Sequence, residues 1–193
     1  VVALGNKMAA TEWQILDFTN RIATSAETLG VGSAEIFALS ATLTSLGLTA
    51  ERGAGWVNDV IRNIAVAATK GNEQLKDIAA VSKMSSQEFQ KAWKDDAYGA
   101  LLKFSEWLAE SGNKYENMVD IFGGNQGALE VMGKLGKAEG LALLNDALKT
   151  SRHEMNLTKG EVSALNAEAE KRFDTMSSQA TIMSNKWRAA FEP

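Results

Sequence analysis

The sequence predicts an all-α protein: a multi-helix globular bundle of short helices separated by glycines, followed by a long C-terminal helix of coiled-coil type. Apolar residues recur at spacings of three and four along most of the chain, which is typical of amphipathic helices. Glycines repeatedly end such a run, and a polar residue that can begin a new helix follows. The alternating Val, Ile, Thr and Tyr runs of strands are missing, as are Asn-Gly and Asp-Gly hairpin turns. We assign residues 1–155 to a helical head and residues 156–193 to the start of a rod.

The composition of the 193 residues excludes several classes of protein. The chain has no cysteine, which excludes disulfides and thiolate metal sites. Its 24 acidic and 20 basic residues give a net charge of -4 with both signs interspersed, so no nucleic-acid footprint is visible. The first residues, VVALGNKM, lack the basic start and the long apolar run of a signal peptide or a membrane span. Because the chain begins without Met, we interpret it as a piece of a longer protein.

The first two helices are predicted from their starts. Thr11 with Gln14 has the spacing of a capping box, and apolar residues continue at helical spacing to Leu29. Gly30 then ends the helix, and Ser33 is expected to cap the next one. Apolar residues cover most of the circumference of this second helix, so we expect it to be the central one.

The third helix is expected to begin at Thr49 and to end at Gly71. Two glycines, Gly53 and Gly55, lie in its first turns, where each costs about 1 kcal/mol relative to alanine. Such glycines usually allow a neighbouring element to approach closely. We therefore predict close helix packing at both positions.

Shorter helices follow in the middle of the chain. Asn72 is expected to begin one that ends near Ser82, and Ser85 with Glu88 forms a second capping box. Asp96 can cap the next helix. Further helices are expected on either side of a glycine-containing break at residues 123–125, and again over residues 141–148.

The last forty or so residues differ, because no glycine interrupts them after Gly160. Thr158 and Glu161 form a third capping box, and an apolar seam with spacings of three and four follows. We expect weak self-association through this seam, lost when Phe173 and Met183 are changed to Asp while the head stays folded. The seam consists of Val162, Leu165, Ala169, Phe173, Met176, Ala180, Met183 and Trp187.

The order of several short motifs resembles the core region of the phage tail tape measure protein family. The resemblance extends over nearly the whole chain; one departure is Ala97, where the family often has proline. The matching motifs are LDFTNRI at 16–22, ATLTSLG at 41–47, MSSQEFQKAW at 84–93, ALLKF at 100–104, LNDAL at 144–148 and EKRFDTMSSQ at 170–179.

This resemblance implies a structural protein of a phage or prophage tail. A tape measure sets tail length, occupies the tail-tube lumen, and is released before or during DNA ejection. The implied partners are further copies of the chain, tail-tube and baseplate hub proteins, tail assembly chaperones, and the host membrane during ejection, with no specific nucleic-acid site. The implied locations are the virion tail and, during assembly, the host cytoplasm.

Catalytic signals are weak, and we expect no enzyme activity, metal or cofactor. His153 and Glu154 begin like a zinc-protease HExxH motif, but Leu157 occupies the second histidine position, so we expect a surface histidine. The glycine-rich residues 123–127 lack the Lys-Ser/Thr of a phosphate loop and are expected to be a helix break. The pair at 95–96 is explained by a helix start, where one aspartate caps and the other favours the helix dipole. Four tryptophans are expected in the core: Trp13, Trp56, Trp93 and Trp107.

Two alternative functions are weighed against the structural one. A membrane-active helical protein is suggested by the small, apolar residues 53–68, although Arg62 and Asn63 interrupt them well short of the roughly 20 residues of a membrane span. A helical segment of a cell-wall-degrading tail protein is the other alternative. No catalytic Glu in a recognisable motif supports it.

Overall fold

The computed structural model describes residues 1–156, which form ten α-helices and no strand, so the predicted all-α class is confirmed for this part of the chain. Apart from Asn156, the predicted rod of residues 156–193, with its seam from Val162 to Trp187, lies outside the described residues. The helices are α1 (Val2–Lys7), α2 (Glu12–Thr28), α3 (Ser33–Ser45), α4 (Ala50–Lys70), α5 (Glu73–Val81), α6 (Ser86–Asp95), α7 (Ala97–Glu110), α8 (Lys114–Phe122), α9 (Gln126–Leu135) and α10 (Ala138–Met155).

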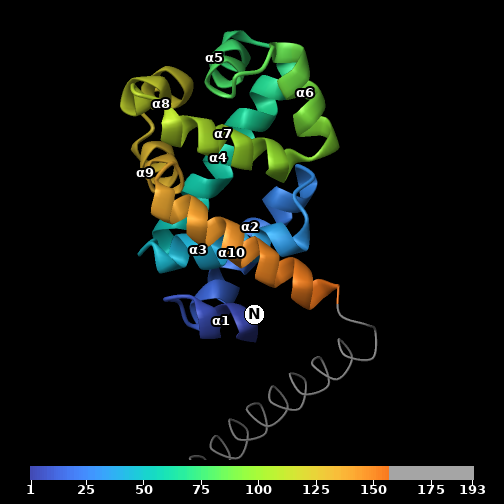
Figure 1. The fold of residues 1–193 in the computed structure, drawn as a ribbon, viewed down its shortest axis with the longest axis vertical. Coiled ribbons are helices and arrows are strands. Elements are labelled where there is room, and N and C mark those ends of the chain that lie inside the picture. The colour runs from blue at the N-terminus through green and yellow to red at the C-terminus, as the bar shows by residue number, and fades with distance from the viewer. Residues whose placement is uncertain (157–193) are drawn as a thin grey trace, which may run out of the picture. The chain divides into compact units, whose positions relative to one another are not determined.

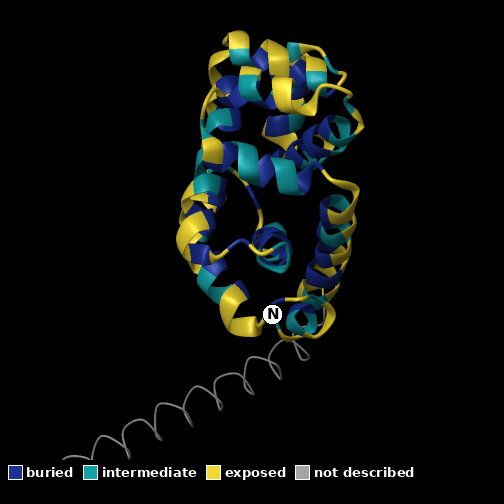
Figure 2. Ribbon diagram, turned by 90° about the vertical axis from the view of Figure 1, so that its left-hand side faces the viewer, coloured by how far each residue is buried: buried dark blue, intermediate teal, exposed yellow. Residues whose placement is uncertain are grey.

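The long helix α4 organises the compact unit Val1–Arg152. Its 21 residues pack against α2, α9, α5 and α6. In Figure 1, α4 therefore runs from the helices around α2 to the helices around α5 and α6. Buried apolar side chains from all ten helices form one continuous core. Figure 2 shows these buried residues on the inner faces of the helices and exposed residues on the outer faces.

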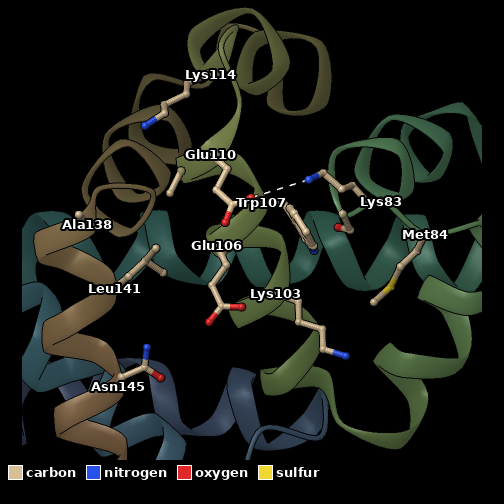
Figure 3. A pocket seen from close by; sticks show the side chains of 12 residues that line it. Lys83, Met84, Lys103, Glu106, Trp107, Glu110, Lys114, Ala138, Leu141 and Asn145 are labelled. Atoms are coloured by element: carbon tan, nitrogen blue, oxygen red, sulfur yellow. Dashed lines mark ion pairs between the residues drawn. The ribbon is translucent and has the colours of Figure 1, made fainter.

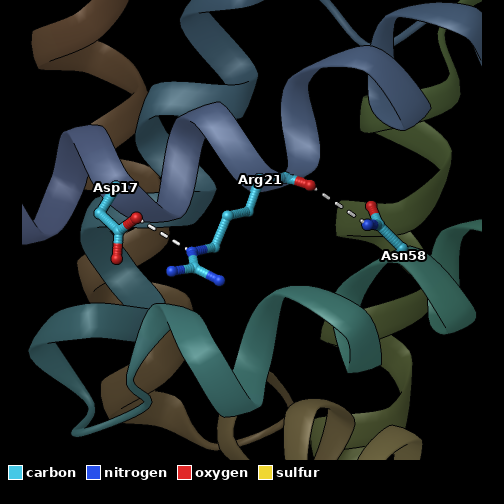
Figure 4. Close-up of polar contacts among 3 residues, drawn as sticks. All are labelled: Asp17, Arg21 and Asn58. Atoms are coloured by element: carbon cyan, nitrogen blue, oxygen red, sulfur yellow. Dashed lines mark hydrogen bonds and ion pairs between the residues drawn. The ribbon is translucent and has the colours of Figure 1, made fainter.

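Helix α2 begins as the sequence predicts, and a hydrogen bond from the Asn58 side chain joins it to α4. The Thr11 side chain and that of Gln14 form the expected reciprocal capping box. Arg21 Nε lies 2.9 Å from Asp17 Oδ1, and Asn58 Nδ2 of α4 donates to the Arg21 carbonyl at 3.4 Å (Figure 4). The Asp17–Arg21 ion pair therefore lies within α2, and the polar contact to α4 is made by the Arg21 backbone carbonyl.

The central position belongs to α4, which packs against α2, α5, α6 and α9, and not to α3 as predicted. Most of the circumference of α3 is covered, as predicted, because none of its residues after Ser33 is exposed. Its start differs from the expectation. Gly32, not Ser33, occupies the N-cap position, and no side chain caps the helix. The extended backbone of Gly32 (φ -75°, ψ 161°) ends the turn one residue earlier than the polar pattern suggested.

The two glycines of α4 have different surroundings. Gly53 is buried, and a Cβ there would lie 2.5 Å from Leu48 Cδ2 and 3.0 Å from Phe18 Cε2, so close packing is present at this position. At Gly55 an added Cβ would meet no atom within 4 Å. The prediction of close packing at Gly55 is wrong because this residue faces outward, where no neighbouring element approaches it.

The middle helices begin at the predicted caps. The side chains of Asn72 and Asp96 each accept a hydrogen bond from the amide three residues further on, at 3.2 and 2.8 Å. Ser85 and Glu88 form the second capping box. Gly123, with φ 60°, ends α8, so the glycine-containing segment before α9 is the expected helix break.

The tryptophans are less buried than predicted. Trp93 is buried and stacks on Phe89, whereas Trp56 and Trp107 are half-buried. Trp13 is 75% exposed, so its assignment to the core is wrong. It lies in the first turn of α2, where no other described helix covers it.

Candidate functional site

A groove lies between α7 and α10. The backbone of α10 approaches the other helices less closely than α2, α4 or α9 do, which leaves a space of about 760 Å³ beside α7. This volume is in the range of small-ligand sites. Figure 3 shows side chains entering the groove from α7, α10 and the α5–α6 turn. The lining residues are Ser82, Lys83, Met84, Lys103, Glu106, Trp107, Ala109, Glu110, Lys114, Ala138, Leu141 and Asn145.

Lys83 joins the α5–α6 turn to α7. Its ammonium nitrogen lies 3.5 Å from the centre of the Trp107 ring and 3.7 Å from Glu110 Oε2. Its backbone is left-handed with φ 51°, the one positive φ among the described residues other than glycine. A second hollow of about 360 Å³ shares Lys83, Trp107 and Glu110 with the groove, so this cluster separates the two hollows.

The charges of the groove are mixed. Three lysines and two glutamates line it, which gives a net charge of +1. Lys83 and Glu110 form the one ion pair among these five residues. Lys103, Glu106 and Lys114 have no ion-pair partner among residues 1–156. A surface with an aromatic ring, aliphatic carbons and unpaired charges of both signs can bind an amphipathic partner.

A second polar cluster holds the end of α10. Arg152 Nε and Nη2 lie 2.9 and 2.8 Å from Glu35 Oε1, and Lys7 Nζ donates to Thr150 Oγ1 at 3.4 Å. The Tyr98 hydroxyl is buried and finds no hydrogen-bond partner among the described residues. Burial raises the pKa of Tyr98, and the nearby Glu35 carboxylate raises it further. The Arg152–Glu35 and Lys7–Thr150 contacts attach α10 to α3 and α1, and none of these residues, nor Tyr98, lines either hollow.

The residues weighed for catalysis on sequence grounds do not come together. His153 is exposed on α10, as expected of a surface histidine. Asp96 caps α7, while Asp95 is the last residue of α6 and therefore does not belong to a helix start. None of these three lines the groove. Within residues 1–156, no group of three or more His, Cys, Asp or Glu side chains is placed to hold a metal ion.

The groove residues could not be identified from the sequence, because the groove is formed by three segments that are distant along the chain: residues 82–84, 103–114 and 138–145. Along α7, Lys103, Glu106 and Glu110 have the spacing of an ordinary solvated helix face, and Trp107 was assigned to the core. The one local signal was an aromatic residue between charged residues at helical spacing, which is not specific.

Comparison of the chain with protein-family models, with curated proteins and with solved structures gave no significant match. Among the helices of residues 1–156, none combines the length and the apolar character needed to cross a bilayer.

Proposed function

We propose that this chain is a structural part of a phage or prophage tail, belonging to the core region of a tape measure protein. The order in which tape-measure-like motifs occur along the sequence is the observation that supports this proposal. Each motif in the described part lies on a helix of its own: LDFTNRI on α2, ATLTSLG on α3 and its end, MSSQEFQKAW at the start of α6 and along it, ALLKF on α7, and LNDAL on α10.

Many of the apolar residues of these motifs are core residues. Phe18 of the first motif, Phe89 of the third and Phe104 of the fourth are all fully buried. Gly47, which ends the second motif, has φ 81° and closes the turn after α3. A chain whose motifs supply helix ends and core residues in this order has the properties of a helical scaffold, which is what the resemblance implies.

In this proposal the chain acts by assembly and not by catalysis. Its partners are further copies of itself, tail-tube and baseplate hub proteins, and assembly chaperones, with the host membrane as a contact during ejection. It resides in the virion tail and, before assembly, in the host cytoplasm. Binding surfaces such as the α7/α10 groove suit such a role, because an open groove of mixed charge can hold another chain.

The two alternatives have less support. In α4, the helix that suggested membrane activity, the apolar side chains Val57, Ile61 and Ile64 are buried in the core of the head. Membrane insertion would therefore require the head to unfold. A cell-wall hydrolase would need two carboxyl groups that act as acid and base; of the two groove glutamates, Glu110 is paired with Lys83, which leaves Glu106 alone.

The proposal is tested with an antibody against this chain and tailed particles induced from the source strain. We expect the protein in intact particles and its loss from the particles after DNA ejection. Its absence from purified intact particles, or an unchanged amount in emptied ones, would contradict the proposal.

A further inference from the structure

Trp13 is an exposed aromatic side chain that the fold of the described residues leaves uncovered. Its side chain is the largest of the exposed apolar ones, and 75% of it is accessible to solvent. Burying an indole ring removes a large apolar area from water, and tryptophan is strongly enriched among residues that dominate protein–protein interfaces. Trp13 lies in the first turn of α2, and its side chain projects into solvent; we call this side chain the knob.

The α7/α10 groove has the features that such a knob requires. Met84, Trp107 and Leu141 contribute apolar atoms from three different segments, and the space of about 760 Å³ is ample for one indole ring. Because Trp13 is solvent-exposed in its own chain, it does not occupy its own groove. A contact between the two features therefore has to join two molecules.

The net charges beside the two features are of opposite sign. The groove carries a net charge of +1, and its side chains without an ion-pair partner among residues 1–156 are Lys103, Lys114 and Glu106. Glu12, next to Trp13, is exposed and likewise takes part in no described ion pair. An indole ring entering the groove would bring the Glu12 carboxylate toward Lys103 or Lys114, which favours the encounter and orients it so that Glu12 lies away from Glu106.

We propose that Trp13 of one copy of this chain inserts into the α7/α10 groove of a second copy. The contact is heterologous, because the knob and the groove are different surfaces of the same molecule. Each added copy leaves one groove and one Trp13 free, so copies join head to tail into open chains or rings. This self-association is separate from the predicted C-terminal seam and does not rest on the proposed tail function.

Sedimentation velocity over a wide concentration range tests the proposal, using the full chain with F173D and M183D so that the seam does not contribute. We expect oligomers that grow with concentration. Trp13→Ser should raise the dissociation constant about thirtyfold, as removal of an interface hot spot does. Tyr115→Ser is the matched control, because Tyr115 is 70% exposed and, although it follows Lys114 on α8, is not among the residues that line either hollow.

A mixing experiment tests the head-to-tail geometry. Leu141→Arg should block the groove and leave Trp13 intact, so mixing it with Trp13→Ser should give heterodimers that do not grow further. A chain that stays monomeric at all concentrations overturns the proposal and leaves the groove to a different occupant. The proposal is also overturned if Trp13→Ser associates as strongly as its parent, or if Tyr115→Ser weakens association as much as Trp13→Ser does. If Leu141→Arg fails to fold, as judged by circular dichroism, the comparison of Trp13→Ser with Tyr115→Ser still decides.

Discussion

The ammonium group of Lys83 lies 3.5 Å from the ring centre of Trp107, while the backbone of Lys83 is held in the left-handed region at φ 51°. A residue other than glycine in this conformation costs roughly 1 kcal/mol or more. The side-chain contact, with the ion pair to Glu110, offsets part of this cost. Through Lys83, the turn between α5 and α6 thus contacts Trp107 and Glu110 of α7, the residues that both hollows share.

Two variants of Lys83 separate the backbone cost from the side-chain contact. Lys83→Ala keeps the left-handed backbone and loses the cation–π contact, so we expect it to lower the free energy of unfolding by about 0.5–1 kcal/mol. Lys83→Gly loses the same contact but relieves the backbone, so it should be more stable than Lys83→Ala by about 1 kcal/mol. Urea unfolding measures both. Equal stabilities would show that the left-handed conformation is not strained.

Gly53 and Gly55 form a matched pair in one helix. Gly53→Ala should lower the free energy of unfolding by about 1–3 kcal/mol, because its Cβ overlaps the buried side chain of Leu48. Gly55→Ala should raise it by up to about 1 kcal/mol, since alanine has the higher helix propensity and space is free. Thermal unfolding of both variants checks the prediction. It is wrong if the two substitutions change stability in the same direction.

Tyr98→Phe should leave the protein equally stable or make it up to about 1 kcal/mol more stable at neutral pH, because the hydroxyl is buried without a described partner. Burial raises the pKa of Tyr98 above its ordinary 10.0. Above pH 10 the unfolded chain then ionises at this tyrosine while the folded chain does not, so stability falls as pH rises. This part of the pH dependence should disappear in Tyr98→Phe and remain in Tyr115→Phe, a control at an exposed position. Identical pH profiles for parent and Tyr98→Phe would contradict the burial.

The capping box of α6 should be visible in the titration of Glu88. Hydrogen bonds from the Ser85 backbone amide (2.7 Å) and hydroxyl (2.8 Å) to Glu88 Oε2 lower the pKa of this carboxyl below its usual 4.5. The stabilisation is present above the unfolded pKa and is lost as pH falls through the lower folded pKa. In an NMR titration, Ser85→Ala should shift the Glu88 pKa upward, whereas Asn72→Ala, which removes a different cap, should leave it unchanged. No shift in Ser85→Ala means that the box does not form in solution.

Local features of this fold could be predicted from sequence because their physical cause is local. The capping boxes at Thr11 and Ser85 need only residues three apart, and the glycine helix ends at Gly71 and Gly123 need only one backbone conformation. The class and the helix order followed from such signals. The prediction that Ser33 caps α3 was wrong because the preceding residue, Gly32, takes the cap conformation itself.

Features that depend on distant contacts could not be predicted. Trp13 follows the apolar period of α2 but extends past the helices that would cover it. Gly127 was considered only as part of a helix break, yet the Trp56 ring of α4 packs directly on it. The α7/α10 groove depends on how far α10 stays from α7, which no helical pattern encodes.

The proposed role as a tape measure is tested most directly by tail length. A tape measure that spans the tail lumen as a helix adds about 1.5 Å of length per residue. In-frame duplication of residues 158–190, whose sequence predicts a helix, should therefore lengthen the tails of assembled particles by about 50 Å for each added copy. Electron micrographs of particles with one, two and three added copies should show stepwise longer tails. Tails of unchanged length in particles that contain the longer protein would contradict the proposed function.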